Sequence, residues 1–259
     1  MITKGEDRAA GLGERGMENL IYASGVWARA SGGTTWSYPG LECFAVTAPR
    51  RGFNQAIITS ASVRNEDIRD AIARYRGLGL RCRFRMRDVL DAEMRPRLES
   101  LGMEHRGGIP AMALSGEMPA GPPALLTVEQ VTDSRGLDAT VAVVAEAFEW
   151  EADELAQVFR QPLIADPAWL GWVGYVYGEP VAASQAVIHN GVAGLYYVAT
   201  RESHRRRGHG EALTRAAVDA VRARGCRLVT LNASPSGFPV YERLGFEHVG
   251  EHTGCVPPD

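Results

Sequence analysis

The second half of the chain alternates apolar runs with segments of helical periodicity. Runs of apolar and β-branched residues at 169–177, 180–189 and 193–200 predict three consecutive strands. We expect the first two to join at Gly178-Glu179. The next two flank Asn190-Gly191, a strong hairpin signal because both residues tolerate a positive φ. The other elements predicted here are strands at 125–131, 227–232 and 247–255, and helices at about 134–148, 153–159, 210–224 and 239–244.

The helix expected at 210–224 is amphipathic. Its apolar residues Leu213, Ala217 and Val221 share one face, and Gly225 supplies a stop signal. Strands before and after such helices predict a mixed sheet covered by helices on both faces. The fold class is therefore α/β, of the α+β kind.

A proline- and glycine-rich stretch at 115–123 divides the chain. Three prolines and two glycines in nine residues cannot continue a helix or a central strand, so this stretch predicts a linker. At 259 residues the chain is long enough for two domains. We expect an N-terminal domain at 1–116, a linker at 117–124 and a second domain at 125–259.

The two halves end alike. Residues 98–107 and 241–250 are identical at six of ten positions, and each copy follows a helix, a glycine turn and a strand. The first copy of that order is 66–76, 77–79 and 80–87. The matching order predicts an internal duplication.

Composition and charge exclude several partner classes. The net charge of -3 gives no basic stripe for a nucleic acid, and 45% apolar residues can fill one or two cores. No apolar stretch reaches the about 20 residues of a spanning helix, and the charged beginning of the chain does not look like a signal peptide. The four cysteines, without a C-x-x-C pair, are expected to be free thiols in the cytoplasm, and no metal ligands are assigned.

The segment 205–210, Arg-Arg-Arg-Gly-His-Gly, lies between a strand and a helix. Gly208 and Gly210 let the backbone approach a bulky anion, and the first amides of the helix point at it. Arg205, Arg206 and Arg207 add positive charge. This pattern suits a pyrophosphate, although a solvated basic turn is the plain alternative. It lacks the third glycine of a dinucleotide fingerprint and the Gly-Lys ending of a nucleotide-triphosphate loop.

Four segments in order resemble the Gcn5-related N-acetyltransferase (GNAT) superfamily across residues 125–259. They are Leu-Tyr-Tyr-Val-Ala-Thr at 195–200, Arg-x-x-Gly-x-Gly at 205–210, Leu-Asn-Ala-Ser at 231–234 and Pro-Val-Tyr-Glu-Arg-Leu-Gly-Phe at 239–246. The resemblance implies tandem GNAT-like domains, each a mixed, mostly antiparallel sheet flanked by helices. It also implies acetyl-CoA as the acyl donor.

The resemblance also implies roles for individual residues. The loop Arg205, Arg206, Arg207, Gly208, His209 and Gly210 would hold the coenzyme A pyrophosphate. Val198 and Thr200 would pair with the pantetheine arm, the Val198 amide polarising the thioester carbonyl. Asn232 and Ser234 would contact the pantetheine amides. Tyr241 matches the tyrosine that protonates the leaving thiolate, although it could instead be a packing residue.

The general base is less defined. Many relatives have a glutamate on the strand that here spans 194–200, and this sequence has none. Glu149 is the first substitute, with Glu151 and His189 as alternatives. A solvated surface carboxylate remains the plain interpretation of Glu149. His204 lies in the phosphate loop and is expected to contact ligand or solvent.

The first half resembles a degenerate copy of the same domain. It has no glycine cradle, Glu66 and Asp67 stand near its helix start, and Leu98 replaces the tyrosine. We expect it to cover the catalytic sheet and wall the acceptor pocket without binding coenzyme A. The aromatic residues Trp27, Trp36, Tyr38 and Phe44 either line that pocket or belong to the core.

The predicted function is acetyl transfer to the amine of a small molecule in a ternary complex. Acetylation of a protein lysine or N-terminus and a catalytically silent acyl-CoA sensor are the alternatives. An intact Tyr241 favours an enzyme over a sensor, and the missing strand glutamate keeps the sensor open. The sequence leaves the oligomeric state open, a homodimer included.

Overall fold

The computed structural model describes residues 4–48, 52–121 and 126–258. The end of the expected linker and Leu125, the start of an expected strand, lie outside these residues. Within them the strands form a single eleven-stranded sheet, ordered β1-β2-β3-β4-β11-β5-β10-β9-β8-β7-β6. The strands are β1 Thr34–Tyr38, β2 Leu41–Ala45, β3 Gln55–Ile58, β4 Arg83–Arg87, β5 Glu104–Leu114, β6 Thr127–Gln130, β7 Trp169–Val176, β8 Glu179–His189, β9 Val192–Thr200, β10 Leu228–Asn232 and β11 Glu247–Val256.

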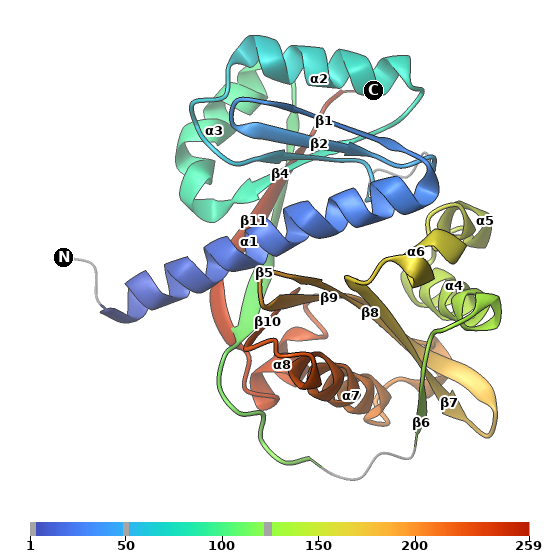
Figure 1. Ribbon diagram of the computed structural model, residues 1–259. Coiled ribbons are helices and arrows are strands. Elements are labelled where there is room, and N and C mark those ends of the chain that lie inside the picture. Colours follow the sequence, from blue (N-terminus) through green and yellow to red (C-terminus); the bar gives the residue numbers. More distant parts are fainter. Residues whose placement is uncertain (1–3, 49–51, 122–125, 259) are drawn as a thin grey trace.

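Helices cover both faces of this sheet, as the sequence predicts (Figure 1). On one side of the C-terminal half, α4–α6 pack on β7–β9. On the other side α7 and α8 build a second core. In the N-terminal half, α2 and α3 cover a third core. The helices are α1 Lys4–Ser31, α2 Asn65–Gly77, α3 Asp88–Ser100, α4 Ser134–Phe148, α5 Ala152–Ala156, α6 Gln161–Ala165, α7 His209–Ala223 and α8 Phe238–Arg243, with a 3₁₀ turn at Glu202–His204.

The two halves repeat one order of elements. In the first, α2-β4-α3-β5 follows β3, and in the second α7-β10-α8-β11 follows β9. The pairs β3–β4 and β9–β10 are both parallel, while the neighbouring pairs are antiparallel. This repeated topology agrees with the duplication predicted from sequence.

The last strand of each half is exchanged. Strand β11 lies between β4 and β5, and β5 lies between β11 and β10. The final strand of the C-terminal half therefore completes the sheet of the N-terminal half, and the reverse also holds. The predicted boundary at 117–124 divides the chain in sequence, and the sheet continues across it.

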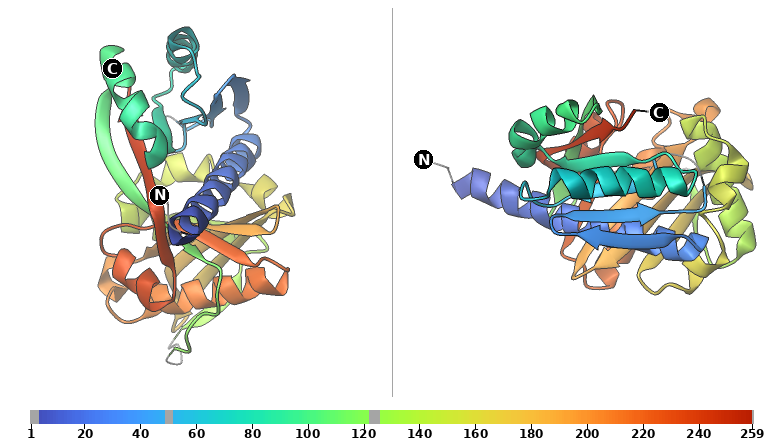
Figure 2. Two further views of the ribbon diagram at one scale, coloured as in Figure 1. Left: turned by 90° about the vertical axis from the view of Figure 1, so that its left-hand side faces the viewer. Right: turned by 90° about the horizontal axis from the view of Figure 1, so that it is seen from above.

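The long helix α1 was not expected from the sequence. It crosses between the two halves on the concave side of the sheet (Figures 1 and 2). Its buried face includes Asn19, Ala23 and Trp27. Glycine allows it to lie close to the sheet, since a Cβ at Gly13 would stand 2.8 Å from the Val249 carbonyl oxygen.

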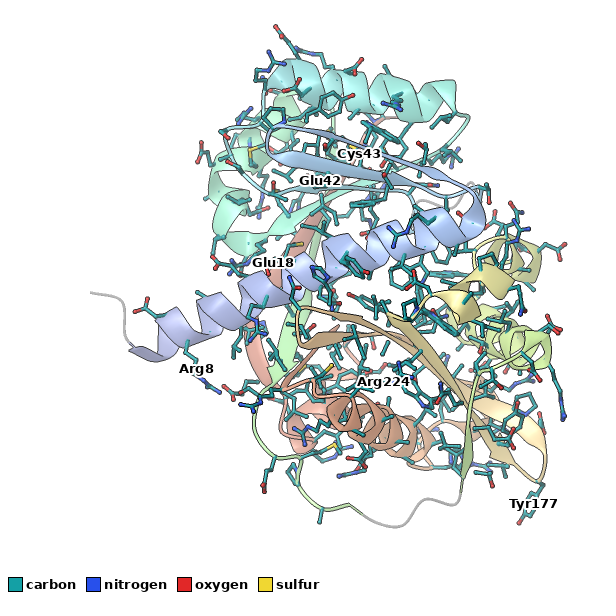
Figure 3. The ribbon with its side chains drawn as sticks, in the orientation of Figure 1. Arg8, Glu18, Glu42, Cys43, Tyr177 and Arg224 are labelled. Carbon is teal, nitrogen blue, oxygen red and sulfur yellow. The ribbon has the colours of Figure 1, made fainter. Side chains whose placement is uncertain are left out.

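The turns and helix ends mostly follow the predicted chemistry. Asn190 and Gly191 have φ of 47° and 71°, as a two-residue hairpin turn requires. The preceding turn is Tyr177-Gly178, one residue before the predicted one, and the Tyr177 side chain projects into solvent (Figure 3). Asp133 caps α4 by accepting from the Gly136 amide at 2.9 Å. The helix predicted at 153–159 ends earlier, as α5, and α6 follows it.

Candidate active site

Strands β9 and β10 separate at one end. Their parallel register runs from Val192 opposite Leu228 to Leu195 opposite Leu231. Beyond that point β9 continues to Thr200 while β10 ends at Asn232. The far end of β9 therefore has a sheet partner only in β8 within the described chain.

A β-bulge lies in that unpaired end of β9. Tyr196 pairs with Gln185 and Ala199 with Ala183, so Tyr197 and Val198 together oppose one residue. Tyr197 has φ of 52°, a left-handed conformation that is uncommon for a bulky residue. The bulge turns Tyr197 toward α1 and α4, and Val198 packs on the side of α7.

The start of α7 offers unpaired backbone amides. Gly208 precedes the helix with φ of 80°, and the first α-helical bond runs from the Ala212 amide to the Gly208 carbonyl at 2.9 Å. No side chain caps this end, so the amides of residues 209–211 have no partner within the helix. A Cβ at Gly208 would meet nothing within 4 Å, and one at Gly210 would lie 3.3 Å from the Thr200 hydroxyl. An anion can approach these amides directly, beside the end of β9.

The three loop arginines have different surroundings. Arg205 donates to the carbonyls of Ala147 at 3.0 Å and Thr200 at 3.3 Å, which ties the loop to the end of α4. Arg206 and Arg207 are exposed and make no hydrogen bond or ion pair with the part of the chain that is described. These two side chains are therefore available to a ligand.

His209 is the buried residue of this loop. Its pKa is lowered by burial and, to a smaller extent, by His204 and Arg207. The imidazole is therefore neutral at pH 7. His204 is only partly exposed, and its Nδ1 lies 2.9 Å from the Ser203 hydroxyl.

Tyr241 lies on α8 with 8% of its surface exposed. Burial raises its pKa to about 12, so the phenol keeps its proton at any physiological pH. The ring packs against Phe246 with centroids 5.7 Å apart, and the hydroxyl has no hydrogen-bond partner among the described residues. Tyr241 is thus a buried proton donor whose hydroxyl is not engaged by the protein.

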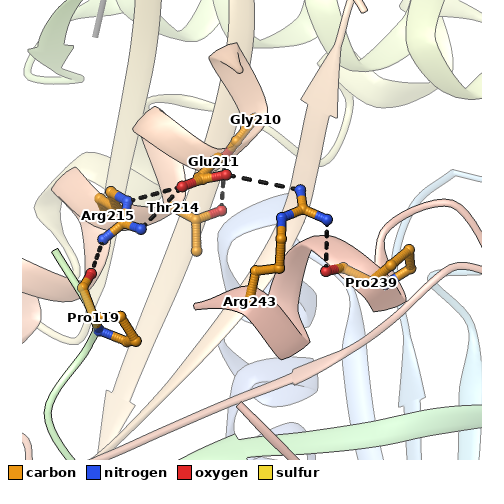
Figure 4. Close-up of polar contacts among 7 residues, drawn as sticks. All are labelled: Pro119, Gly210, Glu211, Thr214, Arg215, Pro239 and Arg243. Atoms are coloured by element: carbon orange, nitrogen blue, oxygen red, sulfur yellow. Dashed lines mark hydrogen bonds and ion pairs between the residues drawn. The ribbon is translucent and has the colours of Figure 1, made fainter. Parts of the chain in front are cut away.

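A polar network fixes the start of α7 relative to α8 (Figure 4). Glu211 accepts from Arg215 at 2.9 Å and lies 3.8 Å from Arg243 of α8. Arg243 also donates to the Pro239 carbonyl at 2.9 Å, and Arg215 to that of Pro119. The anion-facing helix end and the helix that carries Tyr241 are held together.

Similarity to known proteins agrees with this geometry. Residues 137–246 match the model of the acetyltransferase (GNAT) family. This segment, somewhat less than half of the chain, is similar to that family. The fold of that family is the one used for acyl-CoA-dependent acetyl transfer. No curated protein matches the chain.

Solved structures resemble nearly the whole chain and not only the GNAT segment. A GCN5-related N-acetyltransferase from Kribbella flavida is 18% identical with a TM-score of 0.72, covering 92% of this chain and 95% of its own. One from Sphaerobacter thermophilus is 19% identical with a TM-score of 0.55, covering 84% and 76%. A functionally unknown conserved protein from Staphylococcus epidermidis is 12% identical with a TM-score of 0.59, covering 86% and 92%. At these identities the likeness shows the fold, a two-domain GNAT form.

Two of the predicted pantetheine contacts in the GNAT domain already have partners on the protein. Ser234 accepts from the Gly237 amide at 3.1 Å and so supports the turn before α8. The Asn232 side-chain oxygen lies 3.1 Å from Nδ1 of His252. Burial lowers the pKa of His252 to about 3, so its ring is neutral and donates from Nδ1 to that oxygen. Both side chains are therefore engaged by other groups of the protein. Their contact with the pantetheine amides stays a prediction.

The base candidates lie in different places. Glu149 ends α4 with φ of 54° and is exposed. The next residue, Trp150, approaches Tyr197 with ring centroids 6.2 Å apart, so Glu149 borders the site. Glu151 is also exposed and precedes α5. His189 stacks on Tyr22 at 4.0 Å and pairs with Val192, roughly 25 Å of strand away from Thr200. The structure does not bring His189 to the site.

Tyr197 is the centre of an aromatic cluster that joins both halves. Its ring lies 5.3 Å from Trp27, 5.6 Å from Phe53 and 5.1 Å from Phe159, measured between centroids. Of the four aromatic residues considered as pocket candidates, Trp27 alone contacts Tyr197. Trp36 stacks with Arg74 and Tyr75, Tyr38 bonds to Asp70, and Phe44 packs under α1, so these three serve the core of the N-terminal half.

The corresponding loop of the N-terminal half is closed by its own side chains. Arg97 of α3 donates to the carbonyls of Ala61 at 2.6 Å and Val63 at 2.5 Å, and to the Asn65 side chain at 2.9 Å. Asp67, in the first turn of α2, pairs with Arg64 at 2.7 Å. These contacts tie the loop to α3. The amides at the start of α2 also lack a side-chain cap, and the acidic Asp67 stands beside them.

Among the described residues, even the long α1 is not apolar enough over its length to cross a membrane.

Proposed function

We propose that this chain is an acetyl-CoA-dependent N-acetyltransferase that acetylates the amine of a small molecule by direct attack in a ternary complex. The observation that carries the proposal is the open end of β9. It combines a separated strand pair, a bulge at Tyr197 and uncapped amides at the start of α7.

The residues of this end suit acetyl-CoA. The amides of residues 209–211, with the exposed Arg206 and Arg207, would hold the pyrophosphate, where a Cβ-free Gly208 leaves room. Val198 and Thr200 would pair with the pantetheine arm, as a further strand would. When bound, the thioester supplies an activated acetyl group.

The chemistry is a single displacement. The lone pair of the neutral acceptor amine attacks the thioester carbonyl carbon, a C–N bond forms and the C–S bond breaks. Tyr241, which holds its proton because burial raises its pKa to about 12, donates that proton to the departing sulfur. The proton lost by the amine passes to Glu149, through water because that carboxylate is exposed.

A small acceptor is supported by the walls around Tyr197. Side chains from both halves and from α1 surround this residue on the side opposite α7. A protein acceptor would need an open groove at this place. We also propose that the protein works in the cytoplasm, as its composition leads us to expect.

The test is calorimetric titration with acetyl-CoA, followed by a thiol-release screen over a panel of amines. We expect saturable binding and amine-dependent release. Binding without release from any amine would favour the acyl-CoA sensor, and failure to bind acetyl-CoA would refute the proposed function.

A further inference from the structure

Strand β4 turns three arginines toward the interior of the two-domain structure. Phe84 and Met86 face the core beneath α2 and α3, so the alternating residues Arg83, Arg85 and Arg87 face the concave side where α1 lies. Arg87 there pairs with Glu14 at 3.2 Å and donates to the Ala10 carbonyl at 3.1 Å. Arg87 is thus neutralised by α1.

Arg85 is the exception. It makes no hydrogen bond or ion pair with the residues that the structure describes. Its pKa is lowered to about 10, first by burial and then by the charge of Arg83, while Tyr197 and Tyr196 oppose this. Arg85 keeps part of its surface exposed, and a partly buried guanidinium with no carboxylate beside it can bind an anionic group.

Two further polar groups on this side lack partners. Gln55 of β3 is 4% exposed, and its side-chain oxygen has no hydrogen-bond partner within the described chain. The register places Gln55 opposite Arg83 and Ile57 opposite Arg85, so Gln55 and Arg85 lie on the same face of adjacent strands. The Tyr197 hydroxyl is also unpartnered among the described residues. Burial raises the pKa of that phenol and Arg85 counteracts the rise.

These groups come from both halves. Ile57, beside Arg85, belongs to a cluster that packs against Tyr196 of β9, which brings the β3–β4 pair to the bulge. Tyr196 itself is satisfied, because its hydroxyl donates to Asn19 at 2.7 Å. What remains on this side is one unpaired fork of N–H donors, one acceptor oxygen and the hydroxyl of Tyr197, the residue of the β9 bulge.

We propose that Arg85, Tyr197 and Gln55 form an acceptor subsite that binds a small amine which also carries a carboxylate, an amino acid or a short peptide. The Arg85 guanidinium holds the carboxylate through paired N–H bonds and the Tyr197 hydroxyl donates to it. The Gln55 oxygen accepts an N–H of the acceptor. This inference rests on the proposed function for the identity of the reaction, and its binding claim can be tested separately.

The first test measures turnover. The probes are L-amino acids and the matching amino-acid amides, which keep the amine and remove the negative charge. We expect the wild type to prefer the acids, and Arg85→Gln to lose that preference through an about 10- to 100-fold rise in KM for the acids. The KM of the amides and the Kd of acetyl-CoA stay unchanged. Arg69→Gln, on the exposed side of α2, is the control and keeps the preference.

The second test needs no turnover. Intrinsic tryptophan fluorescence, to which Trp27 and Trp150 beside Tyr197 contribute, is followed during titration with N-acetyl-amino acids, the products of the proposed reaction. We expect saturable quenching that is weakened about tenfold or more in Arg85→Gln and less in Tyr197→Phe. The ligand-free variant Arg85→Gln melts at or above the wild-type temperature, because an unpaired charge is removed.

The outcomes separate the two proposals. Thiol release that favours the amides, or that falls equally for both substrates in Arg85→Gln, overturns the subsite and leaves the acetyltransferase intact. A lower melting temperature of Arg85→Gln assigns the side chain a structural role and also overturns it. If no amine releases thiol, the proposed function fails, and the fluorescence titration still decides whether a carboxylate binds at Arg85.

Discussion

The start of α7 allows a substitution that separates ligand binding from folding. Gly208 has φ of 80°, and a Cβ there would contact nothing within 4 Å. Aspartate and asparagine have nearly the same shape, and both tolerate a left-handed conformation better than other residues with a Cβ. Gly208→Asp and Gly208→Asn should therefore share a strain of about 1 kcal/mol. The helix dipole then favours the aspartate by about 0.5 kcal/mol, so Gly208→Asp should be the more stable of the two.

Binding should respond in the opposite direction. If the pyrophosphate lies on the uncapped amides, a carboxylate at position 208 stands roughly 5 Å from its charge. Coulomb repulsion at that distance is roughly 1–3 kcal/mol for an effective dielectric constant between 80 and 20. Gly208→Asp should therefore bind acetyl-CoA about 10- to 100-fold more weakly than Gly208→Asn, which carries no charge.

The assay is calorimetric titration of the wild type and both variants at low and high ionic strength, with melting temperatures from the same preparations. The difference between the two variants should shrink as salt rises, because the Debye length falls. Equal affinities of Gly208→Asp and Gly208→Asn would refute the placement of the pyrophosphate. A large loss of affinity in both variants would indicate that acetyl-CoA binding requires glycine in the left-handed turn, and that charge is not the cause.

Three other predictions concern the proton donor, a buried histidine and the exchanged strands. Tyr241→Phe should lower kcat at least tenfold with an unchanged Kd for acetyl-CoA, and an unchanged kcat would remove Tyr241 from the acid role. His252 has a pKa lowered from 6.5 to about 3, so between these pH values its side chain is protonated in the unfolded chain and neutral in the native state. Stability should therefore fall as pH drops from about 6.5 toward 3, and urea midpoints at pH 7 and 4.5 should differ less in His252→Gln than in the wild type. Expressed alone, residues 125–259 should not unfold cooperatively as a monomer, because β10 and β11 lose β5, and co-expression with 1–124 should restore a copurifying pair.

The sequence predicted the GNAT half well because its signals are local. The period of α7, the stop at Gly225 and the turn at Asn190-Gly191 depend on neighbouring residues, and each appears in the structure. Contacts between distant segments were not predictable in this way. The sequence predicts that Arg205 binds phosphate, whereas in the structure its guanidinium donates to the Ala147 carbonyl.

The missed features have identifiable physical causes. Helix α1 carries Gly11, Gly13 and Gly16, which lower helix propensity, and tertiary packing against the sheet overrides that preference. Arg85 was visible only as one member of an Arg-x-Arg-x-Arg alternation at 83–87. That alternation indicates a polar strand face, and the sequence does not reveal that α1 and β9 cover it.

The exchange of β5 and β11 has a consequence for how the chain reaches its native state during synthesis. Strand β11 is translated about 140 residues after β5, a delay on the order of ten seconds or longer at typical ribosome speeds. Until then β4 has a free edge, and closing the sheet requires a contact of very long sequence separation, which slows folding. A free edge invites pairing with other nascent chains, and charged side chains are a known protection. The side chains of Arg83, Arg85 and Arg87 project from one face of this edge strand. The charges that face the acceptor side in the folded protein would therefore also keep the incomplete chain from aggregating.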